Sequence, residues 1–373
     1  MSNAQPIRVA IVAPSLRILG GQAVQAQRLL DGWRDDAAVS AWLVPHNPVP
    51  PPPLDRLLAI KYVRTLATQL CYWPLLLKQL RHADVVHVFS ASYTSFLLSP
   101  LPAILIAKLH RKPVILHYHS GEAPDHLRRS LIARLTLKSV TRNVVPSSFL
   151  REVFSAFGLR AAVITNVVDL TRFKYRPRDP LRPRLVSTRN FDGLYNVSCT
   201  LRAFSRIQAR YPEATLTLVG AGPQDAMLRR LATELGLRNV TFVGAVPQDE
   251  IHRYYDDGDV YVQTPAIDNM PNSVIEAFAS GLPVVSTGIG GIPAILQDRV
   301  HGLLAADDDD AAIAGHVLSL LDDAAYARSL ATAAFATCDA YRWPVVRTQW
   351  LATYRELATS RSDSEQVVAS EIA

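Results

Sequence analysis

The sequence predicts an α/β protein made of two doubly wound parallel sheets, and three observations lead to this fold class. Short apolar strands alternate with helical segments along most of the chain. The strands are apolar at nearly every position, which is typical of strands buried on both faces of a parallel sheet. The alternation occurs twice, on either side of a proline-rich stretch, and 373 residues suit two domains better than one.

The first half of the chain carries the elements of one such sheet. Gly20 and Gly21 open a helix that is expected to run to about Trp33, and a helical region at 54–81 is interrupted by Pro74. Helices are also expected after each later strand, because parallel strands need crossover connections. The strands are expected at 7–12, 40–44, 85–89, 114–119 and 143–145.

The second half repeats the pattern. Strands are expected at 185–188, 216–219, 240–243, 260–263, 284–286 and 302–305. Helices between them are expected at 197–210, 223–235, 250–255 and 272–280.

The expected domain boundaries follow from composition. Residues 173–183 hold three prolines and show no clear period, so we expect them to link a first domain, 1–172, to a second, 184–342. A helix at 343–358 is expected to pack back on the first domain, and 359–373 to be a disordered tail. Two doubly wound domains joined in this way are expected to face each other across a cleft at the carboxyl ends of their strands.

Charge is distributed unevenly between the two halves. Residues 1–180 carry 23 Lys or Arg against 10 Asp or Glu, a net charge of +13, whereas 181–373 carry 16 against 23, a net charge of −7. We expect the basic half to prefer an anionic partner such as a membrane surface or a phosphorylated acceptor. The aromatic residues show no basic–aromatic repeat, so nucleic-acid binding is not expected.

Cysteine and metal-ligand patterns exclude several classes of protein. Cys71, Cys199 and Cys338 are an odd and widely spaced set, which excludes a disulfide framework and suits a reducing cytoplasm. No cluster of His, Glu and Cys has the spacing of a metal site, so no metal is expected. No apolar stretch is long enough to predict a membrane-spanning helix.

The segment 268–281 carries the strongest chemical signal. A strand ends before it and a helix begins near Asn272, so the free backbone amides of Asn272, Ser273 and Val274 would form an anion site suited to phosphate. Glu276 lies one turn further, where its carboxylate can accept two vicinal hydroxyls such as those of a ribose. Asp268 precedes it by eight residues, within reach of a sugar hydroxyl. A strand–helix–strand crossover with solvated acids is the alternative.

This segment resembles the donor-site signature of glycosyltransferase family 4, whose members are retaining nucleotide-sugar enzymes of the GT-B fold, with two Rossmann-like domains. The signature consists of an acid, seven residues, a Glu, a helix that ends in Gly, a Pro at the next strand and a later Gly-Gly-x-Pro. Those positions are here Asp268, Glu276, Gly281, Pro283, Gly290, Gly291 and Pro293. Further resemblances occur at 20–21, 117–119, 146–148, 166–169 and 219–223.

The resemblance implies roles for residues in both domains. Gly20 and Gly21 would lie near the donor phosphates, and Arg189 would stabilise the departing diphosphate. A histidine at a strand end would lie beside the reacting sugar, and we favour His119 over His117 because it stands at the very end of the strand. We therefore expect His119, Asp268 and Arg189 to be catalytic.

Two departures from the family pattern are visible. The first acid is usually Glu, and here it is Asp268, one methylene shorter. A lysine usually follows the arginine by a few residues, but that place falls near Tyr195, and no lysine occurs after Lys174. Arg189 and the helix amides would then have to supply the positive charge that the leaving group needs.

The resemblance implies a glycosyltransferase that moves a sugar, with retention, from a nucleotide sugar to a saccharide or lipid-linked acceptor. The resemblance to the family also implies that the nucleotide is UDP. Polysaccharide or glycolipid biosynthesis would be its setting, in the cytoplasm or peripherally at the inner face of the cell membrane. No cofactor is expected beyond the donor itself. The alternatives are a non-catalytic GT-B-shaped binding subunit and a sugar-nucleotide epimerase of the same fold.

Overall fold

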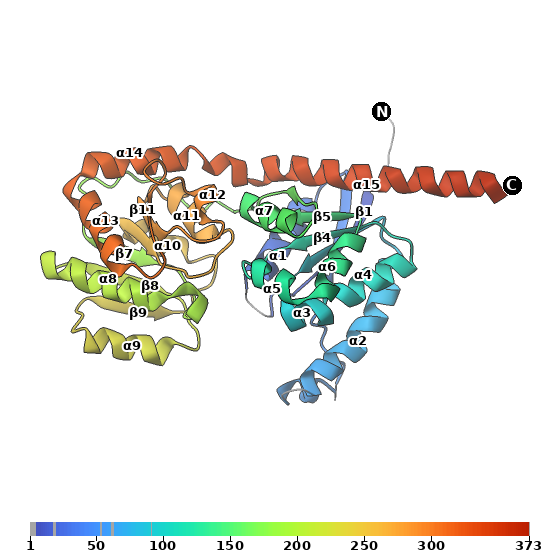
Figure 1. Cartoon of the computed structure of the whole chain (residues 1–373), viewed down its shortest axis with the longest axis horizontal. Helices are drawn as coiled ribbons and strands as arrows, with labels where there is room; N and C mark the ends of the chain where they lie inside the picture. Colours follow the sequence, from blue (N-terminus) through green and yellow to red (C-terminus); the bar gives the residue numbers. More distant parts are fainter. Residues whose placement is uncertain (1–4, 18–19, 53, 61–62, 91, 373) are drawn as a thin grey trace. The chain divides into compact units, whose positions relative to one another are not determined.

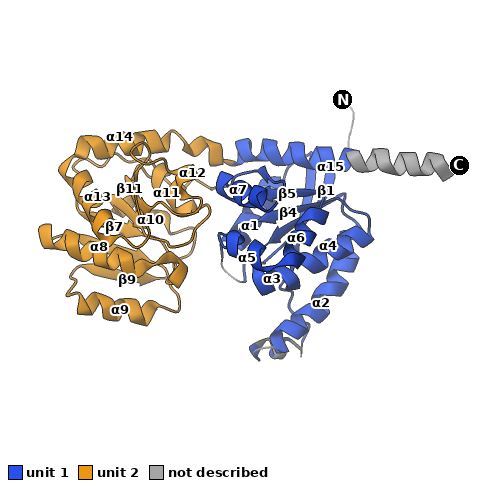
Figure 2. Cartoon of the chain, in the orientation of Figure 1, with its two compact units in different colours: residues 1–167, 343–373 blue, residues 168–342 orange. Residues whose placement is uncertain are grey.

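The computed structural model describes residues 5–17, 20–52, 54–60, 63–90 and 92–372. The chain forms two compact units (Figure 2): unit 1 comprises Met1–Val167 and Trp343–Ala373, and unit 2 comprises Val168–Arg342. In each unit, helices cover both faces of a central sheet (Figure 1). Every strand pairing in both sheets is parallel, as the apolar strands predict.

The sheet of unit 1 has six strands in the order β2-β1-β3-β4-β5-β6. The order reverses between β1 and β3, and such a switch point is where open α/β sheets bind ligands at their carboxyl edge. The strands are β1 Ile7–Ala13, β2 Val39–Pro45, β3 Val85–Ser90, β4 Val114–Tyr118, β5 Arg142–Val145 and β6 Ala162–Val163. The helices are α1 Gly21–Trp33, η1 Leu54–Ala59, α2 Val63–Leu80, α3 Tyr93–Leu98, α4 Pro100–Leu109, α5 Ala123–Arg129, α6 Leu131–Ser139, α7 Ser148–Ala156 and α15 Trp343–Ile372.

The sheet of unit 2 has six strands in the order β12-β11-β10-β7-β8-β9, so its switch point lies between β7 and β10. The strands are β7 Arg184–Ser187, β8 Thr215–Val219, β9 Val240–Gly244, β10 Val260–Gln263, β11 Val284–Thr287 and β12 Leu303–Ala305. The helices are η2 Gly193–Tyr195, α8 Val197–Arg210, α9 Asp225–Glu234, α10 His252–Asp257, α11 Asn272–Ala279, α12 Ile292–Ile295, α13 Asp310–Asp322, α14 Ala324–Phe335 and η3 Cys338–Tyr341.

Burial on both faces explains why the strands are continuously apolar. In β1, Val9 and Ile11 belong to one apolar core, whereas Ala10 and Val12 belong to the other, because successive side chains point to opposite faces. Val9, Ala10, Ile11 and Val12 are all completely buried. A strand that fills two cores therefore favours apolar residues at successive positions.

The two ends of the second unit differ from the expected domain boundaries. Residues 173–183, predicted to be a linker, belong to unit 2, and the chain enters this unit at Val168. The buried Arg178 fixes the segment to unit 2, because its guanidinium donates to backbone carbonyls of that unit. The proline-rich pattern marks a segment without regular structure, but it does not show that the segment is free.

The C-terminal helix also differs from its predicted extent. It was expected to end at 358, before a disordered tail, whereas α15 continues to Ile372. Val346, Trp350 and Tyr354 of α15 lie in the same apolar core as Val9 and Ile11, which is why the helix belongs to unit 1.

Candidate active site

An arginine–aspartate pair occupies the switch point of unit 2. Arg189 follows β7, and Asp268 follows the neighbouring strand β10, so both lie at the carboxyl edge of the sheet. Nη2 of Arg189 lies 2.5 Å from Oδ2 of Asp268, and Nη1 donates to Oγ of Ser273 at 3.1 Å. The Arg189 guanidinium also lies over the ring of Tyr195, 4.0 Å from its centroid. The structure thus brings together three of the predicted donor-site residues.

The pair keeps Arg189 charged in a nearly water-free place. Its side chain is 10% exposed, and burial by itself lowers the pKa of the guanidinium. The Asp268 carboxylate acts against this effect of burial and raises the pKa, and neighbouring tyrosines contribute less. The net result is that the pKa of Arg189 is raised. In the described part of the chain its Nε is buried and has no hydrogen-bond partner. At least one of the five N–H donors of Arg189 thus has no partner among the described residues.

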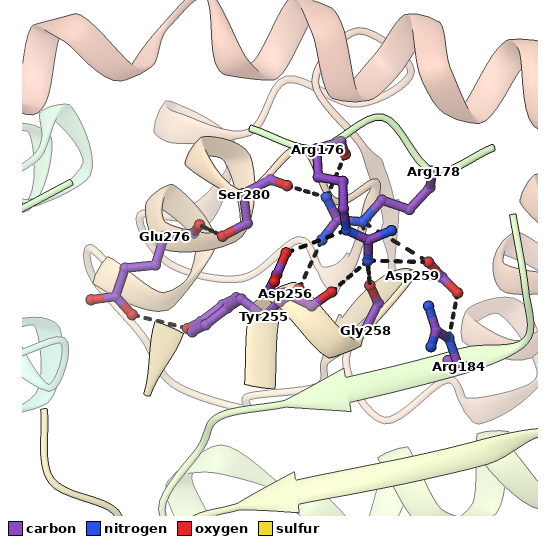
Figure 3. Close-up of polar contacts among 9 residues, drawn as sticks. All are labelled: Arg176, Arg178, Arg184, Tyr255, Asp256, Gly258, Asp259, Glu276 and Ser280. Carbon is purple, nitrogen blue, oxygen red and sulfur yellow. Dashed lines mark hydrogen bonds and ion pairs between the residues drawn. The ribbon is translucent and has the colours of Figure 1, made fainter. Parts of the chain in front are cut away.

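Glu276 lies one turn into α11 and is 6% exposed. The hydroxyl of Tyr255 donates to its Oε2 at 2.9 Å (Figure 3). Burial, and then the Glu276 carboxylate, raise the pKa of Tyr255 well above its usual value, so this hydroxyl stays protonated and keeps donating. Thr188 lies 2.6 Å from the same hydroxyl. Glu276, the acid predicted to hold a ribose, is thus buried, and its carboxylate is oriented by the hydrogen bond from Tyr255.

Hydrogen bonds connect Glu276 with Arg189 through the switch-point strands. Thr188 lies within hydrogen-bond distance of the hydroxyls of both Tyr255 and Tyr261, and Tyr261 donates to Oε1 of Gln263 at 3.4 Å. Ser273 donates to the same oxygen at 3.3 Å and accepts from Arg189. One network of side chains therefore fixes the two charged groups relative to each other, which preorganises them for a ligand that needs both.

The first turn of α11 is only partly available to an anion. Pro271 precedes the helix, and Asn272 and Ser273 are its first two residues. The amide of Val274 was predicted to be free, but it donates to the carbonyl of Pro271 at 3.2 Å. The positive end of the helix dipole nevertheless points to the edge of the sheet where Arg189 lies.

The glycines after β11 pack against the backbone of the loop that carries Asp268. Gly290 has φ of +55°, and a Cβ there would lie 2.0 Å from the carbonyl oxygen of Asp268. A Cβ at Gly291 would lie 1.8 Å from the carbonyl oxygen of Asn269. The amide of Gly291 donates to the carbonyl of Asp268 at 3.2 Å. The two glycines let one backbone pack against another and thereby hold Asp268 in place.

Arg178 joins the elements that carry Tyr255 and Glu276. Its Nη2 donates to the carbonyl of Tyr255 in α10 at 2.8 Å, and its Nη1 donates to the carbonyl of Ser280 at the end of α11 (Figure 3). Burial is the largest cause that lowers the pKa of Arg178, to about 10, so it remains a cation. Oδ1 of the completely buried Asp259 lies 4.0 Å from Nε of Arg178. Its Oδ2 accepts a hydrogen bond from Nε of Arg184 at 2.7 Å.

The predicted unit 1 residues lie at the carboxyl edge of their own sheet. His119 directly follows β4, is half-buried, and stacks on Phe89 with centroids 4.9 Å apart. Burial lowers its pKa to about 3, so its imidazole is neutral at physiological pH. His117 is more deeply buried and lies 3.2 Å from His87, which leaves His119 as the more accessible of the two histidines.

Gly20 and Gly21 line a cavity of about 270 Å³ at the start of α1, together with Phe89. Among the described residues, no atom outside the neighbouring positions lies within 4 Å of a Cβ built at either glycine. Their side-chain positions therefore face open space at the switch point of unit 1, and close packing within the protein does not explain them.

Comparison with known proteins decides the family. Residues 19–172 match the model of "Glycosyltransferase Family 4", and residues 182–323 match that of "Glycosyl transferases group 1". The chain belongs to glycosyltransferase family 4. The resemblance in the sequence is confirmed.

Relatives and solved structures agree with this family and with the GT-B fold. The sulfoquinovosyl transferase of Arabidopsis thaliana is 26% identical over 71% of this chain and 55% of its own length. Glycogen synthase of Mycobacterium tuberculosis is 27% identical over 71% of this chain and 67% of its own length. The chain thus spans about half to two thirds of these relatives. Sucrose-phosphate synthase of Thermosynechococcus elongatus has a TM-score of 0.76 at 19% identity, covering 95% of this chain and 100% of that one. HepE of Anabaena, solved in complex with UDP-glucose, has a TM-score of 0.71 at 18% identity, covering 96% and 100%.

Three residues of this family 4 site were not predicted. Tyr195, under the Arg189 guanidinium, stands near the place where the family usually has its lysine, and that departure was the one signal that pointed to it. Tyr255 and Arg178 gave no signal, because their roles depend on contacts with residues 21 and 102 positions away.

Membrane-spanning helices and metal-binding clusters are both absent from the residues that the structure describes. None of the helices in that part of the chain has the length and apolarity to cross a membrane. No group of three or more His, Cys, Asp or Glu there is arranged to hold a metal ion.

Proposed function

We propose that this family 4 chain transfers a sugar from a nucleotide-sugar donor, with retention of anomeric configuration, to a saccharide or lipid-linked acceptor in polysaccharide or glycolipid biosynthesis. The observation that carries the proposal is the buried Arg189, held by Asp268 and Ser273 beside the start of α11, with Glu276 in the same network. HepE, solved with UDP-glucose, favours a UDP-sugar.

The leaving group decides what the donor site must supply. As the bond from sugar to phosphate breaks, negative charge grows on the departing diphosphate, and fixed cations and dipoles stabilise it. Arg189 offers the positive charge of its guanidinium, and the first turn of α11 adds the positive end of a helix dipole. Both groups are held before the donor arrives, so no reorganisation is needed when the charge develops.

Glu276 fits the other end of the nucleotide. Its carboxylate is buried and accepts from one donor of known position, Tyr255. An ionised carboxylate has about four acceptor sites, so it retains capacity for two vicinal ribose hydroxyls. We assign Asp268 to the hydroxyls of the transferred sugar. For His119, in unit 1, we propose a hydrogen bond to the reacting sugar.

The acceptor is assigned to unit 1, whose switch point carries Gly20 and Gly21. His119 is neutral, so it offers a hydrogen bond rather than a charge. In a front-side mechanism the departing phosphate oxygen accepts the proton of the acceptor hydroxyl. This chain then needs no general base. We propose that no cofactor and no metal take part, because Arg189 and the helix dipole of α11 supply the positive charge.

A calorimetric screen of UDP-, GDP-, ADP- and dTDP-sugars tests the donor assignment. A true donor binds the native state and raises its melting temperature by mass action. Turnover is then measured with the binding donor, with and without EDTA, and the anomeric configuration of the product is read by NMR. Transfer that survives EDTA and keeps the configuration supports the proposal, whereas a product of inverted configuration contradicts retention.

The same measurements separate the alternatives. A binding subunit would bind a nucleotide without turning over any donor. An epimerase would release free nucleotide and a changed sugar when no acceptor is present. Failure of all four nucleotide sugars to bind would overturn the assignment of unit 2 as the donor site.

A further inference from the structure

A cavity of about 440 Å³ lies beside the switch point of unit 1 and takes no part in the donor site. Residues that follow each of three neighbouring strands line it: Arg17 after β1, His46 after β2, and Ser99 after β3. The first turns of α2 close the remaining side. In open α/β sheets, ligands bind where the strand order reverses, and here it reverses between β1 and β3.

The lining of this cavity is cationic and rich in hydrogen-bond donors. It contains the guanidinium groups of Arg17 and Arg64 and the polar side chains of Thr65, Thr68 and Gln69, and none of its lining residues is acidic. Among the residues that the structure describes, neither arginine has a partner in an ion pair. Two uncompensated cations at one cavity favour an anionic ligand.

The start of α2 contributes residues to this lining. Arg64 and Thr65 lie in the first described turn of α2 and line the cavity, whereas the amide of Arg64 donates to the carbonyl of Ile60 at 2.9 Å. The two arginines, in a described lining that contains no acid, are the observation that points to an anion.

This cavity adjoins the cavity that Gly20 and Gly21 line. Both are lined by His46, Ser95 and Ser99. The second cavity also contains Gly21 and Phe89, and Phe89 stacks on His119. A ligand with its anionic group in the first cavity would therefore extend toward His119 without leaving unit 1.

We propose that this cavity binds a phosphate group of the acceptor, so that the sugar is transferred to a phosphorylated molecule. The inference rests on the proposed function and adds the chemical class of the second substrate. The phosphate stays intact: the acceptor hydroxyl forms the new bond to the sugar, the bond from sugar to the donor diphosphate breaks, and the hydroxyl proton leaves with the departing diphosphate. Arg17 and Arg64 fix the orientation of the acceptor and are positioning residues.

The phosphate has two possible sources. A soluble phosphorylated sugar is one, and a lipid headgroup is the other. The lipid has support in α2, which exposes Leu66, Leu70, Trp73 and Leu77 at spacings of four, three and four residues, and thus on one helix face. The chemistry in the cavity is the same for both sources, so the experiment must separate them.

The experiment uses the full chain saturated with UDP, so that the donor site is filled and Arg189 is not available to the probe. Glycerol 3-phosphate is titrated calorimetrically against the natural chain and against Arg17→Gln and Arg64→Gln. Each variant is expected to weaken binding roughly tenfold, because it removes one charge-assisted contact. Arg81→Gln is the matched control: it removes the same charge from an exposed position just after α2 and is expected to leave binding unchanged.

A second arm measures co-sedimentation with vesicles of phosphatidylglycerol and of phosphatidylcholine. Binding to the anionic vesicles alone, lost in Arg17→Gln and Arg64→Gln, identifies a lipid headgroup. Binding of glycerol 3-phosphate without vesicle binding identifies a soluble acceptor. The inference is overturned if neither probe binds, or if both variants bind like the natural chain. Its failure is distinct from that of the proposed function, because UDP affinity is measured first on every variant.

Discussion

Tyr255 donates its hydroxyl to Oε2 of Glu276 at 2.9 Å, and this bond joins the last turn of one short helix to the first turns of the next. The acid that the sequence singled out is therefore not a free surface carboxylate. Its position depends on Tyr255, whose backbone carbonyl is held by Arg178. The donor site consequently rests on a segment that carries no site signature of its own.

The first prediction concerns Glu276→Gln. The variant keeps an oxygen that accepts from Tyr255, so unit 2 should fold, but it loses the negative charge offered to the ribose hydroxyls. We expect UDP affinity to fall roughly 10- to 100-fold, the equivalent of one to two charge-assisted hydrogen bonds, and turnover of the donor to be lost. Calorimetric titration with UDP measures it, and Glu234→Gln, at an exposed position of α9, is the control. Unchanged UDP affinity in Glu276→Gln would show that this carboxylate does not hold the nucleotide.

The second prediction concerns Arg178→Met. Removing the guanidinium leaves the carbonyls of Tyr255 and Ser280 without their donor, and leaves the buried Asp259 with less positive charge around it. We expect the free energy of unfolding of unit 2 to fall by about 3–5 kcal/mol. The exposed Arg253→Met should change it by less than about 0.5 kcal/mol.

Tryptophan fluorescence supplies an internal control for this experiment. All five tryptophans of the chain belong to unit 1, so their unfolding transition should not move in Arg178→Met. Hydrogen exchange of α10 and α11 reports the change in unit 2. Equal exchange in Arg178→Met and Arg253→Met would mean that this buried arginine is dispensable.

The third prediction concerns His119→Ala. His119 lies in unit 1, whereas the residues assigned to the nucleotide lie in unit 2. We therefore expect kcat to fall roughly 100-fold, as for the loss of one hydrogen bond to the reacting sugar, while the Kd for UDP stays within about twofold. Steady-state kinetics and UDP titration together measure the split. Parallel losses in kcat and in UDP affinity would make His119 a structural residue only.

The fourth prediction is an acid sensitivity of unit 1. Burial lowers the pKa of both His87 and His119 to about 3, and that of His117 also falls well below its usual value. The folded chain keeps these rings neutral, whereas the unfolded chain protonates them below about pH 6.5. Stability is thus complete above pH 6.5 and is lost as the pH falls from 6.5 toward 3. For the fully buried His87 the slope is about 1.4 kcal/mol per pH unit.

Denaturation followed by tryptophan fluorescence at several pH values measures this slope in unit 1. His87→Gln removes one titrating ring and should flatten the slope, while the exposed His82→Gln should keep it. A slope that is the same in His87→Gln and in the natural chain would contradict the assignment of acid sensitivity to the buried ring.

The sequence by itself determined the fold class and the candidate acids. Strands such as β1 are apolar at every inner position because they fill two cores, and that pattern is visible in the chain itself. Asp268 and Glu276 lie eight residues apart within one loop-and-helix segment, so their spacing could carry a family signature. Both patterns involve residues that are close together in the chain, so they can be recognised from the sequence alone.

Only the tertiary structure decided which distant residues complete the site. Arg189 meets Asp268 because β7 lies beside β10 in the sheet, and strand order is not written in the pattern of any single strand. Arg178 lies in a proline-rich segment that reads as a linker, yet its guanidinium is buried among carbonyls from two helices. Such contacts depend on how several elements pack at once, because each carbonyl becomes available only when its own helix has ended in the right place.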